Sequence, residues 1–351
     1  MMVAIAMSGG VDSSVAAALL KEQGYRVIGI TMIAVPALHH AAARAAYIAR
    51  SLGIDHITVD CHELFHQRVI APFCAAYRCG KTPNPCVRCN DAVKFGFLRD
   101  YAERCGAALF ATGHYARIER DGKRNTFRLV PGIDSRKDQS YFLYRLDHVR
   151  LARIILPLGM MTKEQVKQYA RSMALPVLYD RESQDICFLS GMDYGAFVAQ
   201  HAPGSALPGP IVNCAGEVLG THRGIIHYTV GQRRGIGIAA GEPLYVVALD
   251  PGRNAVIVGS KKDLYRKECT AGEVVWIDGS VPHTPLRVLA KIRSLHQAAM
   301  AWVVPHETTQ VNVRFDAPQM SITPGQSIVF YDPASGCVLG GGIIEELPQD
   351  R

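Results

Sequence analysis

Three cysteines lie in two short stretches that are suited to thiol chemistry. Cys86 and Cys89 belong to GKTPNPCVRCN, and Cys187 belongs to SQDICFL, far downstream. The thiolate is the form of cysteine that attacks sulfur and binds metals, and nearby cations such as Lys81 and Arg88 favour it. The C-x-x-C spacing by itself allows half of a metal site, a redox pair, or a nucleophile with a neighbouring thiol.

A second motif, SGGVDSS, is suited to binding phosphate. It follows the apolar run VAIAM and opens a periodic, helix-like segment. Gly9 and Gly10 would let backbone N–H groups approach a phosphate closely, and the helix N-terminus would add partial positive charge. The loop lacks the lysine of a Walker A motif, so we expect it to hold pyrophosphate as that group leaves. We expect Asp12 to help hold Mg²⁺ against the phosphate oxygens.

The composition limits the class of protein. The 351 residues, of which 48% are hydrophobic, are enough for roughly two or three domains. Ten cysteines without a signal-peptide pattern favour a reducing cytoplasm, and no segment reaches the ~18 apolar residues of a membrane span. The formal charge of +7 permits a polyanionic partner such as nucleic acid but does not require one.

The elements that must position these motifs change along the chain. Residues 1–115 alternate apolar strands with periodic helices, which is typical of a parallel sheet covered on both faces. The pattern from 138 to 200 is mostly helical, with YFLYRL and KEQVKQYARSMAL as its clearest segments. After the Pro- and Gly-rich HAPGSALPGPI come short strands between turn signals. The sequence therefore predicts an α/β domain at 1–200 with a helical extension, a central β-rich adaptor domain at 201–264 and a C-terminal β-barrel at 265–351.

Five further motifs follow SGGVDSS in a fixed order: TPNPCVRCN, KDQSYFLYRL, SQDICFL, GQRRGIGI and TPGQS. SGGVDSS resembles the PP-loop of the ATP pyrophosphatases, which have an adenine nucleotide alpha hydrolase-like fold. The complete set resembles the tRNA-specific 2-thiouridylases over essentially the whole chain. That resemblance implies that O2 of the wobble uridine 34 of a tRNA attacks the α-phosphate of ATP and releases pyrophosphate. Sulfur from a protein persulfide then displaces AMP to leave 2-thiouridine.

The same resemblance implies roles for individual residues. Cys187 would carry the persulfide and Cys89 would be the nucleophile, which either releases sulfide or closes a transient Cys89–Cys187 disulfide. The implied nucleotide contacts are Ala6, Met7, Ser8, Gly9, Gly10, Val11, Asp12, Ser13, Met32 and Gly113. The implied tRNA contacts are Asn84, Pro85 and Cys86 around a splayed-out target base, with His114, Lys137, Asp138, Gln139, Arg293, Ser294 and Gln326. The implied cofactors are ATP and Mg²⁺, and the implied partners are the tRNAs for Lys, Glu and Gln and a persulfide carrier such as a cysteine desulfurase or sulfur relay protein.

Cys86 departs from the family pattern, because many members carry Asp at this position. A carboxylate there could act as a general base, so its absence puts that role in doubt. A third thiol also opens a second route, in which Cys86, Cys89 and Cys187 hold an iron–sulfur cluster whose open iron binds the sulfide to be transferred. A zinc site of Cys74, Cys79, Cys86 and Cys89 would have an uncommon spacing, and helical periodicity predicts that Cys74 faces a core.

Several of these residues also have a simpler structural explanation. Asp138 could cap a helix, and Arg233 and Arg234 could form either a solvated turn or a phosphate-binding loop. The remaining cysteines, 61, 105, 214, 269 and 337, are interpreted as packing residues. The Ala-rich IAVPALHHAAARAA lacks the polar loop expected after the second strand.

Two other functions remain open from the sequence alone. One is another PP-loop adenylating ligase or amidotransferase, for which the three cysteines would be incidental. The other is a non-catalytic RNA-binding protein with a nucleotide-sensing domain.

Overall fold

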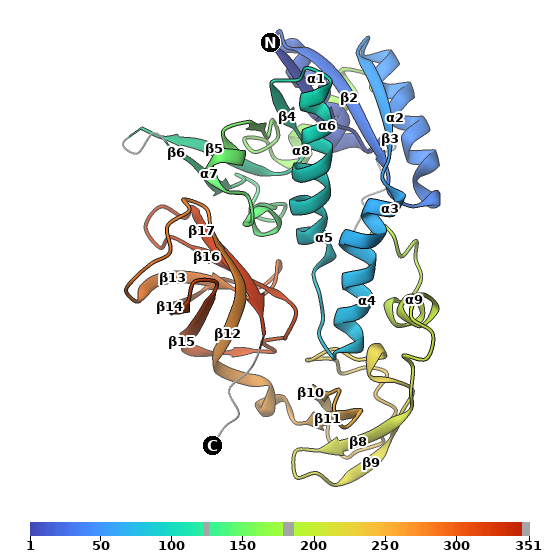
Figure 1. The fold of residues 1–351 in the computed structure, drawn as a ribbon, viewed down its shortest axis with the longest axis vertical. Coiled ribbons are helices and arrows are strands. Elements are labelled where there is room, and N and C mark those ends of the chain that lie inside the picture. The colour runs from blue at the N-terminus through green and yellow to red at the C-terminus, as the bar shows by residue number, and fades with distance from the viewer. Residues whose placement is uncertain (123–125, 178–185, 346–351) are drawn as a thin grey trace.

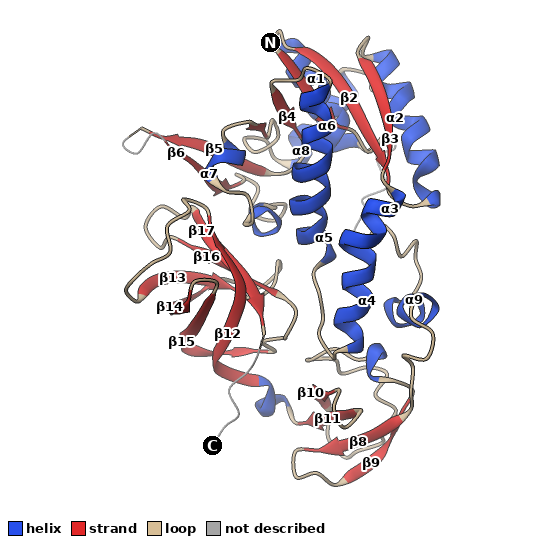
Figure 2. Ribbon diagram, viewed as in Figure 1, coloured by secondary structure: helices blue, strands red, loops and turns tan. Residues whose placement is uncertain are grey.

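The computed structural model describes residues 1–122, 126–177 and 186–345. Its parallel sheet and covering helices occupy one end of the molecule, a small β-rich domain occupies the other, and a β-barrel lies beside them (Figure 1). Strands from far apart in the sequence meet in the barrel region (Figure 2). The expected fold class, an α/β domain followed by a central β-rich domain and a C-terminal barrel, is confirmed.

A five-stranded parallel sheet forms the core of the first domain, in the order β3-β2-β1-β4-β7. Its strands are β1 (Met2–Ala6), β2 (Arg26–Ile33), β3 (Asp55–Asp60), β4 (Leu109–Ala111) and β7 (Ile154–Ile155). Both faces of β1 are covered: Val3 and Ile5 face one core cluster and Ala4 faces the other. The connections run outward in opposite directions from β1, so the carboxyl ends of β1 and β4 flank the crevice where such sheets bind ligands.

Helices cover the two faces of this sheet. One face packs against α1 (Val11–Glu22), α2 (His39–Ser51) and α8 (Lys163–Ser172), and the other packs against the helix that carries Cys89. Helix α8 is the predicted KEQVKQYARSMAL segment, and it begins with a capping box between Thr162 and Gln165. None of the helices in the described part of the chain is long and apolar enough to cross a membrane.

Two broken helices connect the sheet to the rest of the molecule and lie side by side (Figure 1). The first runs through α3 (His62–Phe65), the π-helical η2 (His66–Ile70) and α4 (Ala71–Arg78). The second runs through α5 (Pro85–Arg88), the π-helical η3 (Cys89–Leu98) and α6 (Arg99–Arg104). Their apolar faces share one core, in which Cys74 is buried as predicted. π-helical turns are rare and often mark functional sites.

The barrel is closed and receives a hairpin from the first domain. Its strands are β12 (Tyr265–Trp276), β13 (Leu286–Lys291), β14 (Ala299–Glu307), β15 (Gln310–Met320), β16 (Ser327–Tyr331) and β17 (Val338–Ile344), and β12 pairs with β17 to close it. The hairpin of β5 (Ala116–Asp121) and β6 (Thr126–Pro131) joins β17 where Leu129 lies opposite Val338. We did not expect this hairpin, because the strand and helix alternation suggested only parallel pairs up to residue 115.

The central domain is a four-stranded sheet in the order β10-β11-β8-β9. Its strands are β8 (Gly209–Asn213), β9 (Val218–His222), β10 (Tyr245–Asp250) and β11 (Ala255–Gly259). Short 3₁₀ turns also occur at η1 (Pro36–Leu38) in the first domain and at η5 (Ile225–His227) and η6 (Lys261–Leu264). Cys214, which we interpreted as a packing residue, is exposed at the end of β8, so that interpretation is wrong.

The segment from 138 to 200 is less regular than its periodicity suggested. The described helices there are η4 (Ser140–Leu143), α7 (His148–Leu151), α8 and α9 (Tyr194–His201). YFLYRL forms only the 3₁₀ turn η4, because its aromatic residues are used between domains rather than along one helix. The hydroxyl of Tyr141 donates to the Ser327 carbonyl at 2.8 Å, and that of Tyr144 donates to the Gly342 carbonyl at 3.3 Å.

Candidate active site

The SGGVDSS loop lies between β1 and α1, as the sequence predicted. Gly9 has a φ of +71°, in the left-handed region that favours glycine. The backbone N–H of Ser8 donates to Ser13 Oγ at 3.2 Å, and the hydroxyl of Ser14 donates to the Gly10 carbonyl at 2.8 Å. The loop is therefore folded onto the helix N-terminus by its own serines, in a shape that suits a phosphate.

Helix α2 covers this loop closely, which explains its Ala-rich sequence. A Cβ at Gly9 would lie 2.7 Å from the carbonyl oxygen of Ala41 and 3.1 Å from the backbone nitrogen of Ala45. Arg44 Nε donates to the Gly9 carbonyl at 2.9 Å. Small residues on α2 thus permit the approach, and the arginine fixes it.

Gly113 and Met32 lie at the carboxyl ends of β4 and β2, the two strands that flank β1. A Cβ at Gly113 would lie 2.9 Å from the backbone nitrogen of Ser13, so this glycine allows the segment after β4 to contact the start of α1. Met32 is the last but one residue of β2, not a residue beyond it, and its half-buried side chain packs against two core clusters. Their contacts with a nucleotide remain a prediction.

Asp12 is engaged by two other side chains. Lys163 Nζ lies 2.7 Å from Asp12 Oδ1 and 2.8 Å from Oδ2, and the hydroxyl of Tyr115 donates to Oδ1 at 2.6 Å. Both oxygens therefore already have donors, and Asp12 does not present an open carboxylate to Mg²⁺ in this arrangement. Lys163 instead supplies positive charge at the loop, the feature that the motif itself lacks.

The loop before the C-x-x-C pair is held by the barrel. The backbone N–H of Thr82 donates to the Pro324 carbonyl at 2.8 Å, and Gln326 Nε2 donates to the Thr82 carbonyl at 2.9 Å. Asn84 caps α5 by accepting from the N–H of Val87 at 3.4 Å. Gln326 and Asn84, both implied tRNA contacts, thus have structural roles in positioning α5.

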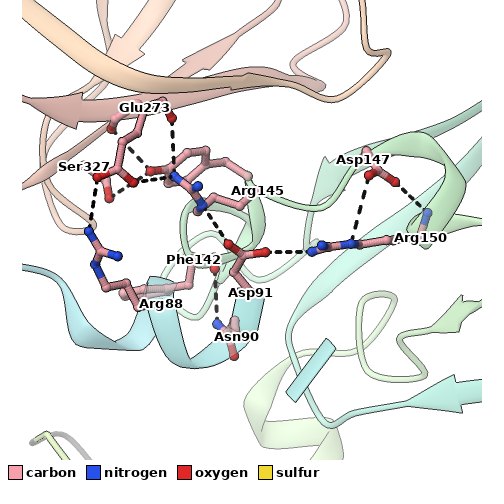
Figure 3. Close-up of polar contacts among 11 residues, drawn as sticks. Arg88, Asn90, Asp91, Phe142, Arg145, Asp147, Arg150, Glu273 and Ser327 are labelled. Carbon is pink, nitrogen blue, oxygen red and sulfur yellow. Dashed lines mark hydrogen bonds and ion pairs between the residues drawn. The ribbon is translucent and has the colours of Figure 1, made fainter. Parts of the chain in front are cut away.

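The back of the cysteine-bearing helix is fixed by polar contacts (Figure 3). Asn90 Nδ2 donates to the Phe142 carbonyl at 3.1 Å. Asp91 binds Arg145 Nε at 2.9 Å and Arg150 Nη1 at 2.6 Å with its two carboxylate oxygens. We call this side of the helix the paired face. A cavity of about 290 Å³ lies between it and the barrel, and none of the three cysteines lines that cavity.

Cys86, Cys89 and Cys187 lie on the other side of the helix, close enough to affect one another's charge. Cys89 is buried, whereas Cys86 and Cys187 reach the surface of a crowded region. Burial raises the pKa of Cys89 to about 12; Lys94 lowers it, and charges on Cys187 and Cys86 raise it. Burial also raises the pKa of Cys86 and Cys187, and Lys94 again opposes the shift. We call these three thiols and Lys94 the thiol face.

The proposed metal sites do not fit this arrangement. No group of three or more His, Cys, Asp or Glu side chains in the described residues is placed to hold a metal ion. The zinc alternative fails in addition because Cys74 is buried in a core while Cys79 is exposed at the end of α4. All ten cysteines are free, so the structure has the thiols in their reduced form.

His114 is a buried neutral imidazole beside the thiol face. Its Nδ1 lies 2.7 Å from the hydroxyl of Thr112, and its ring centroid lies 5.8 Å from that of Phe95. Burial holds the pKa of His114 well below its ordinary value, and the charge of Lys94 lowers it further. The ring can therefore exchange hydrogen bonds with a substrate without adding positive charge.

Asp138 and Gln139, two implied tRNA contacts, are used within the fold. Asp138 accepts from the backbone N–H groups of Gly132 and Ser140 at 3.1 and 3.0 Å, but the N-cap position of η4 is Gln139, so Asp138 is not the helix cap that the sequence allowed. Gln139 accepts from the N–H of Tyr115 at 3.0 Å, and its own N–H donates to the Tyr115 carbonyl at 2.8 Å. Contacts of these side chains with tRNA remain predictions.

Arg293 joins the central domain to the barrel. Its Nη2 donates to the carbonyls of Val230 and Ser321, each at 3.1 Å, and to the Thr323 hydroxyl at 2.5 Å. Ser294 beside it is half-buried. Because Nη2 makes all three bonds, Arg293 can bind a phosphate only through the rest of its guanidinium.

The remaining predicted RNA contacts lie at different depths. Lys137 is half-buried and Pro85 is buried. Arg233 and Arg234 are exposed on the loop after η5. Arg233 lines a cavity of about 470 Å³ with residues 235–244. In SQDICFL, residues 183–185 lie outside the described part of the chain.

Sequence reasoning missed Lys94, Lys163 and Asp91. Lys163 opens the predicted helix, but its pairing with Asp12 depends on how α8 packs against α1. Lys94 follows Cys89 by five residues, a spacing that shares a face only in a π-helix. An α-helix would instead place residue 93 near Cys89, so no ordinary periodicity could have identified this lysine.

Comparisons with known proteins assign the chain to a family. Three family models match: the tRNA methyl transferase HUP domain at residues 1–191, the tRNA methyl transferase PRC-barrel domain at 195–260 and the aminomethyltransferase beta-barrel domain at 266–344. The tRNA-specific 2-thiouridylase MnmA 1 of Caldanaerobacter subterraneus is 44% identical, over 98% of each chain. The tRNA-specific 2-thiouridylase MnmA of Desulforudis audaxviator is 46% identical, over 97% of this chain and 98% of its own. With this identity over nearly the full length, the chain belongs to the tRNA-specific 2-thiouridylase family.

Proposed function

We propose that this chain is a tRNA-uridine 2-sulfurtransferase that uses ATP. The observation that supports this most is the thiol face, where Cys187 and Cys89, far apart in the sequence, lie within electrostatic reach of each other. The PP-loop lies at the carboxyl edge of the same domain's sheet, where ATP would bind. Family membership supplies the substrate class, and the cysteine pair supplies the sulfur chemistry.

The first step is adenylation of the uridine. O2 of the uracil attacks the α-phosphate of ATP, and the bond to the β-phosphate breaks to release pyrophosphate. The PP-loop serines, the N-terminus of α1 and Lys163 are placed to stabilise that leaving group. Mg²⁺ would supply further positive charge to the phosphates when bound, and Asp12, the carboxylate in the first turn of α1, is already paired with Lys163.

The second step transfers sulfur. Cys187 carries a persulfide, and the Cys89 thiolate attacks it. The atom attacked is Sγ of Cys187 itself, so a disulfide bond forms between the Sγ atoms of Cys89 and Cys187, the bond from Cys187 Sγ to the outer sulfur breaks, and hydrosulfide leaves. The hydrosulfide adds to C2 of the adenylated uridine and displaces AMP. A dithiol or thiol reductant then reopens the disulfide with two electrons before the next turnover.

The finer parts of the proposal rest on the family resemblance and, for the location, on the cysteine content. The modified base is the wobble uridine 34, in the tRNAs for Lys, Glu and Gln, and the reaction takes place in the cytoplasm. The persulfide comes from a cysteine desulfurase or a sulfur relay protein. We derive no step through an iron–sulfur cluster, because the three thiols are not arranged as a metal site.

A reconstituted reaction tests the function. Purified protein, ATP, a persulfide donor and tRNA lacking 2-thiouridine should yield pyrophosphate, AMP and 2-thiouridine, detected by mass spectrometry of digested tRNA. Release of AMP and pyrophosphate without thiouridine would reject sulfur transfer and favour another adenylating ligase. Tight tRNA binding without pyrophosphate release would favour the RNA-binding alternative.

A further inference from the structure

Lys94 is a cation in the centre of the thiol face to which the reaction described above gives no role. It lies on η3, the π-helical segment that begins at Cys89. The helix is π-helical at this lysine, since the N–H of Arg99 donates to the Lys94 carbonyl five residues earlier. A π-helix has more residues per turn than an α-helix, so Cys89 and Lys94, five residues apart, lie on the same side of the helix.

The rotation of this helix is fixed from behind. Arg145 and Arg150 bind the two carboxylate oxygens of Asp91, which follows Cys89 by two residues (Figure 3). The neighbouring Asn90 donates to the Phe142 carbonyl. Because these contacts prevent the helix from turning, Cys89 and Lys94 are held toward Cys86 and Cys187.

The half-buried ammonium of Lys94 has no hydrogen bond or ion pair with any described residue. The titratable groups that face it are thiols and one imidazole: Cys86 on α5, Cys89 on its own helix, Cys187 before α9 and His114 after β4, with Cys61 beside Cys89. No carboxylate of the described ranges is among them. Within those ranges, the ammonium therefore lies next to groups that become anionic by losing a thiol proton.

We propose that Lys94 is a positioning and activating residue for sulfur transfer, whose ammonium stabilises the thiolate of Cys89 as its proton leaves to water. The thiolate then attacks as described under the proposed function, on which the catalytic part of this inference rests. Burial raises the pKa of Cys89 to about 12, and Lys94 is the positive charge that opposes this shift. Without it, the fraction of Cys89 in the reactive form falls further.

The other positively charged groups near the site act elsewhere, which explains why a lysine is useful beside the thiols. The SGGVDSS loop and Lys163 can act on phosphates, but they belong to the nucleotide end of the site. Arg88 and Arg145, the other cations near η3, bind Glu273 and Asp91 on the paired face. Among the described residues, Lys94 is thus the cation whose charge reaches all three thiols.

Cysteine alkylation tests this without depending on tRNA. Full-length wild type, Lys94→Gln and Lys94→Arg are treated with iodoacetamide between pH 7 and pH 10, and each cysteine is followed by mass spectrometry. Trypsin cleaves after Arg88, so Cys86 and Cys89 fall in separate peptides. Lys94→Gln should slow alkylation of Cys89 by about tenfold at a given pH, since a shift of one pKa unit changes the thiolate fraction tenfold. Lys94→Arg should retain most of the rate.

Two controls separate an electrostatic effect from damage to the fold. Cys214 is an exposed thiol whose pKa responds to Asp263 and Arg266 rather than to Lys94, so its rate should not change. Lys262→Gln, an exposed lysine in η6, should leave every cysteine at its wild-type rate. An unchanged rate at Cys89 in Lys94→Gln, or an equal loss in Lys94→Arg, would overturn the proposal.

The catalytic part is tested by separating the two half-reactions. Lys94→Gln should form 2-thiouridine about tenfold more slowly while releasing pyrophosphate at the wild-type rate. Parallel loss of both activities would overturn the thiol assignment and place the ammonium on the phosphates. A wild type that makes no thiouridine would reject the proposed function, while the alkylation rates would still decide whether Lys94 stabilises the Cys89 thiolate.

Discussion

The helix that carries Cys89 has two faces built in opposite ways. On the paired face, Asp91 is bound by Arg145 and Arg150, and Arg88 is bound by Glu273. On the thiol face, Lys94 has no anionic partner among the residues that the structure describes, and the buried Cys89 is held in its neutral form. The two faces therefore differ in charge pairing although Asp91 and Lys94 lie on the same ten-residue helix, η3.

This difference separates positioning from reaction. Charged side chains that are already paired form directional contacts and hold a helix in one rotation, but they interact only weakly with a substrate. The ammonium of Lys94 gains a favourable interaction when a neighbouring thiol becomes a thiolate. The paired face thus fixes the geometry, and the thiol face can change its charge during the reaction.

The largest effect should come from removing a sulfur atom from the thiol face. Cys89→Ser and Cys187→Ser should each lower 2-thiouridine formation by about 1,000-fold or more, because a hydroxyl neither holds a persulfide nor attacks one readily. Pyrophosphate release should persist in both variants, since the PP-loop is untouched. Measuring both products in one reaction checks this. Cys269→Ser, a buried thiol of the barrel, is the matched control for sulfur chemistry.

Breaking the paired face should affect stability first. Asp91→Asn removes the charge shared by Arg145 and Arg150 and should lower the free energy of unfolding by about 1–3 kcal/mol, discounted for partial exposure. Chemical denaturation measures this. Asp100→Asn removes the exposed partner of Arg99 on α6 and should lower the free energy of unfolding by no more than about 0.5 kcal/mol. Equal costs for the two variants would mean that the paired face does not fix the helix.

Giving the thiol face a carboxylate should make it resemble the paired face. Cys86→Asp places an anion near Lys94, and we expect the two to pair. An anion near Cys89 and a neutralised lysine both raise the thiol pKa, so alkylation of Cys89 should slow by about tenfold. Cys86→Asn has the same shape without the charge and should leave the rate near that of wild type. A faster Cys89 in Cys86→Asp would contradict this account of the thiol face.

The motifs were predictable where the chemistry is local. The strand, loop and helix around SGGVDSS lie where the sequence placed them, because apolar alternation and glycine requirements act over a few residues. The barrel and central domain followed from short strands between turn signals. Cys89 and Cys187 could be named only through the family resemblance, since no spacing connects residues so far apart.

What the sequence could not predict depends on three-dimensional packing. The β5–β6 hairpin is stabilised by joining β17 of another domain, so its own sequence does not reveal its partner. The sequence predicted that Asp12 helps hold a metal ion, whereas in the structure Asp12 forms an ion pair with Lys163. Lys94 reaches the thiols because η3 is π-helical, and a π-helix has no periodic signature in a sequence.

The smallest effect should come from the contact that links the barrel to the thiol face. Gln326→Ala removes the 2.9 Å bond to the Thr82 carbonyl and should cost about 1 kcal/mol of stability, a typical value for one hydrogen bond. Because Thr82 precedes α5, we expect 2-thiouridine formation to fall by a few-fold while pyrophosphate release stays constant. Gln319→Ala, which removes a half-buried glutamine of β15 and its bond to the Ala317 carbonyl, is the control. If the variant bound tRNA more weakly but thiolated bound tRNA at the wild-type rate, Gln326 would instead be a tRNA contact. Titration of tRNA at fixed ATP distinguishes the two roles.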